Sequence, residues 1–339
     1  MSSPLLAVRD LVVHFPTDDG LVKAVDGVTF DVARSETVAL VGESGSGKTV
    51  TSLAILGLLP KRAEVSGSIE LDGVELVGKP AKEMRPVRGK HIAMVFQDAL
   101  AALNPVFTVG DQISEAIAVH APDVSRKELH ERAIHLLDVV GIPNPSARVD
   151  QYPHEYSGGM RQRAVIAMAI SNEPDLLIAD EPTTALDVTI QAQVLDTMTR
   201  IQDRTNSAIL LITHDLGVVA GMADRVLVMY AGRQIEQGTI DDIFYGPRHP
   251  YTMGLLASLP RLDRRTDHAS RLYRIGGQPP SLLNVPPGCA FHPRCAVAEV
   301  PGRCNTELPE LRSMGDGHSA ACHRANEFER AELLRTEIA

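Results

Sequence analysis

The sequence predicts a three-layer α/β domain with a mixed central sheet, an antiparallel β edge and an inserted helical subdomain, followed by a small irregular C-terminal domain. A short apolar run at 38–41 leads through a glycine-rich loop into an apolar helical pattern. Two later apolar runs, at 174–181 and 208–213, have the length and composition of buried strands in a parallel sheet. Between them and the first run, residues 105–141 change to a helical period, which indicates the insert.

Size and composition are those of an ordinary globular protein. The chain has 339 residues, enough for two domains, and a net charge of −10. We therefore expect residues 1–245 to form the main domain, with the helical subdomain at about 98–165, and residues 246–339 to form the second. The acidic balance argues against a general nucleic-acid binder, which needs basic surface. No apolar run is long enough to span a bilayer and no signal peptide is visible, so we expect a cytoplasmic chain.

The N-terminal part predicts β-structure. Val28, Phe30 and Val32 alternate with polar residues, as in a half-buried strand. Phe15 lies ahead of an acidic turn, where an aromatic ring could stack on an adenine but is more often a core residue. Residues 67–74 predict a hairpin that turns at Asp-Gly, and residues 91–96 predict a short strand that ends at Gln97.

The helical insert carries an N-terminal capping signal. Ser125 and Glu128 have the spacing of a capping box. One apolar face follows at helical spacing, marked by Leu129, Ala133, Leu136 and Val140.

The glycine-rich loop after the first strand has the pattern of a phosphate-binding loop. It consists of Gly42, Glu43, Ser44, Gly45, Ser46, Gly47, Lys48 and Thr49. Its glycines let backbone N–H groups converge on anionic oxygens, and the following helix directs its positive end to the same point. Lys48 is expected to reach the β- and γ-phosphates, and Thr49 to offer its hydroxyl to Mg²⁺. The alternative, an ordinary glycine-rich turn, does not require lysine and threonine at these positions. The loop predicts that the protein binds a nucleoside triphosphate.

A second anion site is indicated at 157–162, ahead of a helix expected at 164–170. Its residues are Ser157, Gly158, Gly159, Met160, Arg161 and Gln162. A hydroxyl, open backbone N–H groups and a helix dipole converge there. A glycine-rich helix cap without a ligand is the alternative.

Polar residues follow both later strands. Asp180 is expected to hold Mg²⁺ beside Thr49, and Glu181, the next residue, to act as a general base on a water molecule. His214 follows the neighbouring strand and is expected to contact the γ-phosphate and orient that water. Either acid could instead belong to a solvated turn, and a single histidine after a strand is weak evidence for a catalytic role.

The remaining elements of the main domain are a helix, a hairpin and a capped helix. Ala185-Leu186-Asp187 precede a helix whose apolar face contains Ile190, Val194, Met198 and Ile201. A hairpin is expected at 226–237, and Thr239 with Asp242 caps a short helix.

Over residues 5 to about 245, the chain resembles the ATP-binding subunit of ABC transporters. The resemblance rests on the order of its motifs: the phosphate loop, Gln97, the 157–162 segment, the 176–181 strand, Asp187 and His214. The resemblance implies a P-loop NTPase fold of the ABC type and a head-to-tail dimer that holds two ATP molecules between its subunits. It makes Phe15 the adenine-stacking residue and Asp187 a dimer-interface residue. It also makes Gln97 the link from Mg²⁺ and water to the membrane subunits, and the Ser157 loop the binder of the partner's ATP.

The segments at 247–260 and 275–295 resemble the C-terminal region of oligopeptide and dipeptide importers. The resemblance implies an ATPase that drives peptide import from the cytoplasmic face of the membrane. Its partners would be a second ATP-binding subunit (a paralogue or a second copy), two transmembrane permeases and, indirectly, an extracytoplasmic solute-binding protein. Relatives also import nickel, glutathione or antimicrobial peptides. Rival classes are a soluble ABC ATPase acting on nucleic acid or ribosomes, and a nucleotide-gated scaffold.

Four cysteines occur, all in the C-terminal region: Cys289, Cys295, Cys304 and Cys322. In a reducing compartment, four thiols in a proline-rich stretch favour a metal group over disulfides. The spacing lacks the paired C-x2-C of zinc ribbons, while four thiolates suit a [4Fe–4S] cluster, which the importer resemblance also implies. Zinc with nearby histidines and four unligated thiols are the alternatives.

Overall fold

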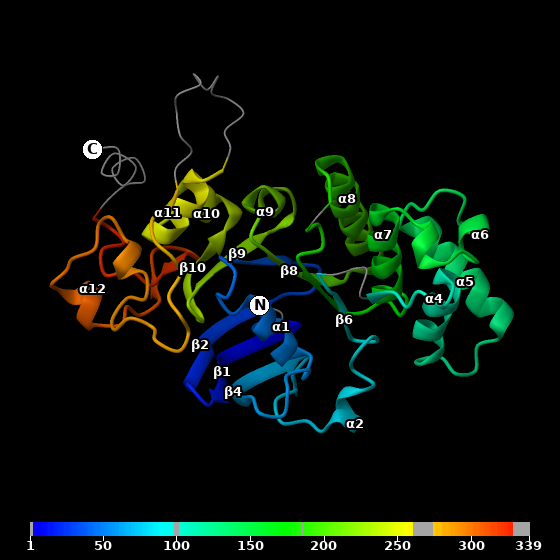
Figure 1. Cartoon of the computed structure of the whole chain (residues 1–339), viewed down its shortest axis with the longest axis horizontal. Coiled ribbons are helices and arrows are strands. Elements are labelled where there is room, and N and C mark those ends of the chain that lie inside the picture. Colours follow the sequence, from blue (N-terminus) through cyan, green and yellow to red (C-terminus); the bar gives the residue numbers. More distant parts are fainter. Residues whose placement is uncertain (1–2, 98–101, 185, 260–273, 328–339) are drawn as a thin grey trace, which may run out of the picture.

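The structure, a computed structural model, describes residues 3–97, 102–184, 186–259 and 274–327. Two β-sheets lie at the centre of the molecule, with helices at both ends of its long axis (Figure 1). The described chain begins at β1 in the smaller sheet. Its C-terminal region lies at the end of the molecule that contains α12 (Arg303–Thr306).

The smaller sheet is antiparallel and has the order β2-β1-β4-β5. Its strands are β1 (Leu6–Thr17), β2 (Gly20–Val32), β4 (Glu64–Leu71) and β5 (Val74–Glu75). Val28, Phe30 and Val32 are buried on one face of β2, which confirms the alternation in the sequence. Asp72 and Gly73 both have positive φ, at 49° and 76°, and turn β4 into β5 as the Asp-Gly pair predicts.

The larger sheet is mixed and has the order β11-β12-β10-β9-β3-β8-β7-β6. Its parallel part consists of β9 (Arg225–Tyr230), β3 (Thr37–Val41), β8 (Ala208–Thr213), β7 (Leu176–Asp180) and β6 (Ile92–Val95). Every residue of β3, β7 and β8 is buried, because both faces of this part are covered. The antiparallel strands β10 (Arg233–Thr239), β12 (Ser319–Ala320) and β11 (Arg312–Ser313) extend one edge. The mixed sheet with an antiparallel edge is thus confirmed.

Alternate residues of the parallel strands enter two different cores. Leu40, Ile178 and Leu210 pack toward the small sheet and α1 (Lys48–Ile55). Their neighbours Ala179 and Leu211 face the opposite core, with α8 (Val188–Thr205) and the helical insert. The period of two along each strand therefore separates the three layers.

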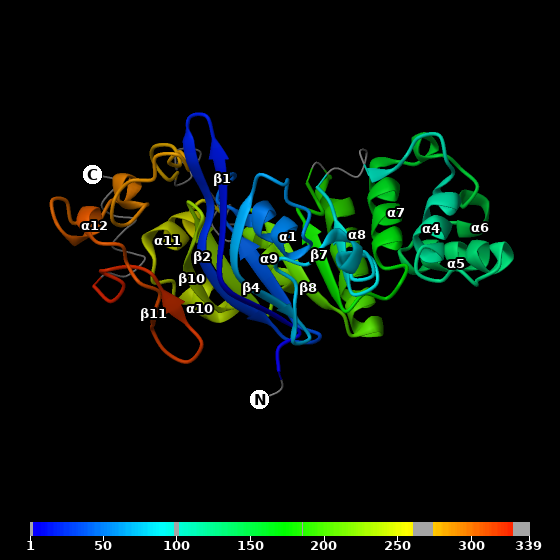
Figure 2. The same cartoon turned by 90° about the horizontal axis from the view of Figure 1, so that it is seen from below.

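The helical insert lies at one end of the molecule (Figure 2). It contains α4 (Val109–Ala118), α5 (Arg126–Val139), α6 (Pro145–Arg148) and α7 (Gly158–Ala169), while the short α2 (Ala81–Met84) lies before β6. Ser125 caps α5 by accepting a hydrogen bond from the Glu128 N–H. Leu137 is buried in this helix and Leu136 only half-buried, so the expected face is shifted by one residue at this turn.

The α7 helix begins at Gly158, six residues earlier than the sequence pattern suggests. Ser157 Oγ accepts a hydrogen bond from the Met160 N–H at 3.3 Å and fixes this start. The capping interaction outweighs the low helix propensity of two glycines.

The C-terminal region joins the main sheet through the β10–β12 pairing. It follows α9 (Leu216–Met222), β9, β10 and α10 (Ile240–Tyr245), and begins with α11 (Pro250–Ala257). Thr239 and Asp242 form the expected capping box of α10. In the described ranges, no helix is both long and apolar enough to cross a membrane.

Candidate nucleotide-binding site

The phosphate loop connects β3 to α1 and requires glycine at two positions. A Cβ on Gly42 would lie 2.3 Å from the Met229 carbonyl oxygen. Gly47 has φ 106°, and a Cβ there would lie 2.5 Å from the Ala24 carbonyl oxygen. The backbone of the loop is thus pressed against two other segments, and any side chain at these positions would force it away from the helix N-terminus.

Lys48 is buried beneath this loop. Its Nζ donates hydrogen bonds to the carbonyl oxygens of Gly42 at 2.7 Å and Glu43 at 3.0 Å. Burial lowers the pKa of Lys48, while Glu181, Asp180 and Glu43 act in the opposite direction. An ammonium group held here suits a phosphate oxygen at the mouth of the loop.

Ser46 gives a further indication of an anion. Its Oγ is buried and has no hydrogen-bond partner among the residues that the structure describes. A buried hydroxyl without a partner is costly, and a phosphate oxygen bound in the loop would accept its hydrogen bond.

Asp180 ends β7 directly beside the phosphate loop. Its carboxylate accepts a hydrogen bond from the side chain of Thr49. Burial raises the pKa of Asp180, whereas the Thr49 bond and Lys48 lower it. A hydroxyl and a carboxylate in contact next to a phosphate site are a donor set that suits Mg²⁺.

Glu181 brings three predicted site residues together. Its Oε2 accepts hydrogen bonds from Gln97 Nε2 at 2.8 Å and Thr184 Oγ1 at 2.9 Å, and its Oε1 lies 3.0 Å from His214 Nδ1. Glu181 has φ 48°, an unusual conformation for a residue with a side chain. Burial by itself would raise the pKa of Glu181, but the bonds from His214 and Thr184 outweigh it, and the pKa is lowered. The group is therefore a carboxylate at neutral pH.

The Ser157 loop does not belong to this cluster. Figures 1 and 2 both place α7 with the helical insert and α8, away from α1. Ser157 and Gly158 are exposed, and Arg161 is turned back to the Pro153 carbonyl oxygen at 2.7 Å. A Cβ on Gly159 would lie 2.5 Å from Ile190 Cγ2, so glycine allows α7 to pack closely on α8.

Two other predicted residues have local structural roles in this chain. Asp187 is exposed and caps α8, because its Oδ1 accepts hydrogen bonds from the N–H groups of Thr189 and Ile190 at 3.0 Å. Its neighbour Ala185 lies outside the described residues. Phe15 is half-buried within β1 opposite Val22, and packs against the core between the sheets.

Sequence reasoning missed the contacts of Glu43. Arg294 donates two hydrogen bonds to its carboxylate, at 2.7 and 3.0 Å, and the Glu43 N–H donates to the Tyr251 hydroxyl at 2.8 Å. Sequence pattern could not connect residues that lie more than 200 positions apart. The C-terminal region thus touches the phosphate loop directly.

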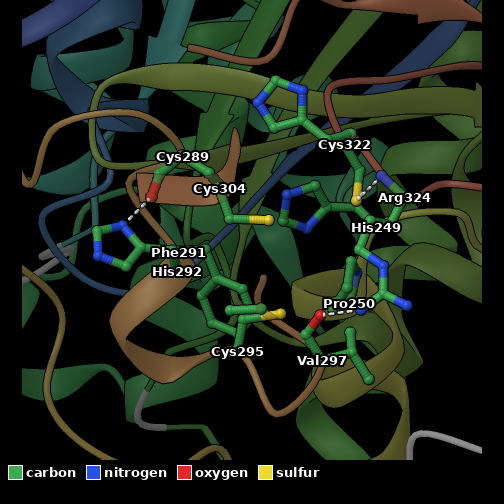
Figure 3. Close-up of a pocket in the computed structure, with 12 residues that line it drawn as sticks. His249, Pro250, Cys289, Phe291, His292, Cys295, Val297, Cys304, Cys322 and Arg324 are labelled. Carbon is green, nitrogen blue, oxygen red and sulfur yellow. Dashed lines mark hydrogen bonds between the residues drawn. The ribbon is translucent and has the colours of Figure 1, made fainter. Parts of the chain in front are cut away.

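The four cysteines converge on one small pocket of about 20 Å³, room for about one water molecule. Figure 3 shows the sulfur atoms of Cys295, Cys304 and Cys322 directed toward the same space, beside Phe291 and His249. Burial raises the pKa of Cys295 and of Cys322 to about 12. Four thiols are a donor set for zinc or an iron–sulfur cluster. At the spacing seen here, no three histidine, cysteine or acidic side chains of the described ranges stand ready to hold a metal ion.

Two family profiles match the sequence. The profile described as "ABC transporter" matches residues 25–184. The profile described as "Oligopeptide/dipeptide transporter, C-terminal region" matches residues 235–301. The first includes the phosphate loop, Gln97 and the strand that ends at Asp180, and the second includes Cys289 and Cys295.

Curated relatives match over nearly the whole chain. The dipeptide transport ATP-binding protein DppD of Bacillus subtilis is 52% identical over 94% of both chains. The oligopeptide transport ATP-binding protein OppD of Mycobacterium tuberculosis is 54% identical over 95% of this chain. The present chain spans only 52% of that relative's length.

Solved structures share the fold. The structure of cbiO1 from Clostridium perfringens, part of the ABC transporter complex cbiONQ, is 27% identical with a TM-score of 0.61, over 72% of this chain and 92% of that one. A dimeric ATP-binding cassette, MJ0796 with ADP and Pi, is 22% identical with a TM-score of 0.62, over 69% and 98% of the two chains.

Proposed function

The chain belongs to the ATP-binding proteins of the ABC transporter family, and from this premise we propose that it is the ATP-hydrolysing subunit of a membrane importer for oligopeptides or dipeptides. The observation that carries the ATPase activity is the meeting of Gln97, Glu181 and His214 next to the phosphate loop. The assignment of peptides as the substrate rests on the profile match of the C-terminal region and on relatives that are named for oligopeptide and dipeptide transport.

Each side chain has a distinct task in the proposed hydrolysis. The loop N–H groups, Ser46 and Lys48 bind and orient the phosphates. Thr49, Asp180 and Gln97 would hold Mg²⁺, which neutralises phosphate charge when bound. Glu181 accepts a proton from the attacking water at a carboxylate oxygen, and His214 orients Glu181 and contacts the γ-phosphate. Phe15 stacks on the adenine.

The second half of the site comes from another ATP-binding subunit. The exposed Ser157 loop of one subunit contacts the γ-phosphate bound to Lys48 of the other, and Asp187 lies at the interface. Exposure of Ser157, Gly158 and Asp187, with an 84% exposed Val188 beside them, supports this arrangement. The partner we propose is a paralogous ATP-binding subunit, with a second copy of this chain as the alternative.

The remaining partners follow from the importer function. Two permease subunits bind the ATPase on the cytoplasmic face of the membrane, and a solute-binding protein outside the cell delivers the peptide. The ATPase domain comprises residues 1–245, with its helical subdomain at about 98–165, and residues 246–339 form the C-terminal domain. The matched ranges 25–184 and 235–301 support this division. Nucleic acid has no part in the function.

The test is peptide-dependent ATP hydrolysis by the transporter reconstituted with its permeases and solute-binding protein in liposomes. We expect dipeptides or oligopeptides to stimulate phosphate release, and nickel or glutathione to have no effect. Stimulation by nickel or glutathione alone would replace the substrate assignment, and hydrolysis without permeases on addition of RNA would replace the transport assignment.

We further propose that the four cysteines hold a metal group, a [4Fe–4S] cluster in preference to zinc. The convergence of the thiols on one apolar pocket supports the proposal. Burial raises the pKa of Cys295 and of Cys322, so a bound cation is needed to keep these two thiols deprotonated.

Protein purified without oxygen should contain about four irons and four sulfides per chain and absorb broadly near roughly 400 nm. Stoichiometric zinc without iron would make the region a structural zinc site. Four free thiols with neither metal would contradict the proposal.

A further inference from the structure

Glu43 lies inside the phosphate loop, but its side chain is directed to the C-terminal region. Arg294 Nη1 donates to Glu43 Oε2 at 2.7 Å, and Arg294 Nη2 donates to Glu43 Oε1 at 3.0 Å. The Arg294 side chain is only 5% exposed and the Glu43 side chain 27%. Paired parallel bonds with little solvent are the geometry in which an arginine–carboxylate contact fixes orientation as well as position.

The two residues are held from several sides. Arg294 also donates to the Tyr230 hydroxyl at 3.2 Å and, through Nε, to the Gly276 carbonyl oxygen at 2.9 Å. The Glu43 N–H donates to the Tyr251 hydroxyl at 2.8 Å. Both the backbone and the side chain of Glu43 are therefore fixed by groups that lie outside the loop.

The position of Glu43 matters for ATP because its carbonyl oxygen accepts a hydrogen bond from Lys48 Nζ at 3.0 Å. A shift of Glu43 would move the loop backbone that is to surround the phosphates, and the ammonium group with it. Neither Arg294 nor Tyr251 has to touch the nucleotide to affect its binding.

We propose that Arg294 is a positioning residue for the phosphate loop, and that it transmits the state of the cysteine pocket to the ATP site. The inference rests on the proposed function only in that the loop binds ATP. Arg294 acts through Glu43, whose orientation it holds, and has no part in the chemical step.

The connection to the cysteines is short. Arg294 ends a single 3-10 turn, His292–Arg294, between Cys289 and Cys295. Phe291, which precedes this turn, lines the cysteine pocket (Figure 3). Its ring packs edge-on against Tyr230 at 5.3 Å and Tyr251 at 5.4 Å between ring centroids. Fixing or freeing the cysteines would therefore move Arg294 and the aromatic rings that support it.

The test measures the dissociation constant of ATP for the purified full-length chain. We expect Arg294→Gln and Glu43→Gln each to raise it about 10-fold, and the double variant to raise it no further, because the two changes remove one interaction. Arg294→Lys should restore part of the affinity. Arg303→Gln is the matched control: its ion pair with Glu307 lies in the same region but is more than half exposed, so the affinity should not change.

Thermal unfolding of the same variants separates positioning from folding. A purely structural role would lower the melting temperature and leave the ATP affinity of the folded protein unchanged, which would overturn the inference. Additive effects of the two single changes would overturn it as well. Failure of the unaltered chain to bind ATP would instead contradict the proposed function.

A second set of variants tests the connection to the cysteines. Cys295→Ser should raise the dissociation constant of ATP in the unaltered background and leave it unchanged in the Arg294→Gln background. An equal effect in both backgrounds would show that the cysteine pocket reaches the nucleotide by another route, and would overturn the proposed link.

Discussion

Glu181 receives hydrogen bonds on both of its carboxylate oxygens. Gln97 and Thr184 donate to one oxygen, and His214 lies against the other. These contacts offset the effect of burial and keep the pKa of the acid below its usual range. Glu181 is therefore oriented and ionised. Because its pKa is lowered, its carboxylate is also a weaker base.

Glu181→Gln should retain ATP binding while turnover falls roughly 10²-fold or more, the scale expected for loss of a general base. The amide keeps the shape and most of the hydrogen bonds but cannot accept the proton. Phosphate release by the assembled transporter and nucleotide binding are the two measurements. Turnover close to that of the unaltered protein would contradict the assigned role.

His214→Ala should lower turnover and move the acidic limb of the pH–rate profile to higher pH. Because the pKa of Glu181 is lowered from its ordinary value of 4.5, its carboxylate becomes protonated only at a pH below that value. Without His214, less opposes the effect of burial, so the pKa of Glu181 rises and protonation begins to remove the active carboxylate at a higher pH.

The control for this profile is His91→Ala. His91 is half-exposed and paired with Asp175, with no contact to Glu181. Its profile should coincide with that of the unaltered protein, and an unchanged limb in His214→Ala would show that His214 does not set the pKa of Glu181.

At the scale of elements, the phosphate loop is shaped by the segments that pack against it. Gly45 and Gly47 both have positive φ, at 77° and 106°, yet only Gly47 is pressed against another backbone. Space for a Cβ at Gly45 is open. In the sequence, Gly45 and Gly47 are both simply glycines of the phosphate-loop motif. Only the tertiary contact at Gly47 distinguishes the two positions.

Gly45→Ala should lower the free energy of unfolding by about 1 to 2 kcal/mol, the cost of the left-handed conformation. Gly47→Ala should lower it further and abolish ATP binding, because the new methyl group meets the Ala24 carbonyl oxygen. Urea denaturation of the two variants gives the comparison. Equal losses of stability would mean that contact with Ala24 does not constrain the loop.

At the scale of the whole molecule, the phosphate loop and the Ser157 loop, which we propose to form the two halves of an ATP site, do not meet within one subunit. The phosphate loop lies at the centre, and the Ser157 loop lies on the helical insert. In the proposed head-to-tail dimer, the second subunit brings its Ser157 loop to the nucleotide bound in the phosphate loop of the first.

Ser157→Arg, placed in the Glu181→Gln background, should prevent ATP-dependent dimer formation with the partner ATPase subunit and leave ATP binding intact. An arginine would crowd the exposed loop that is to contact the partner's γ-phosphate. Light scattering with and without ATP gives the mass. Thr199→Arg, on the exposed part of α8, is the control that should still dimerise, and a dimer with Ser157→Arg would contradict the head-to-tail arrangement.

The sequence by itself determined the mixed sheet, the inserted helices and the family, since these depend on local period and on short motifs such as the phosphate loop. It also placed Asp180, Glu181 and His214 at the ends of adjacent parallel strands, where their meeting follows from topology. It did not locate the start of α7, which depends on one capping hydroxyl.

Only the tertiary structure decided what Glu43 does. Its ion pair joins residues 43 and 294, which lie in different regions of the chain and have no shared period or motif. Contacts between distant segments depend on how complete elements pack, here β10 with β12 and Phe291 with two tyrosines. For this reason the link between the cysteine region and the phosphate loop is visible only in the folded chain.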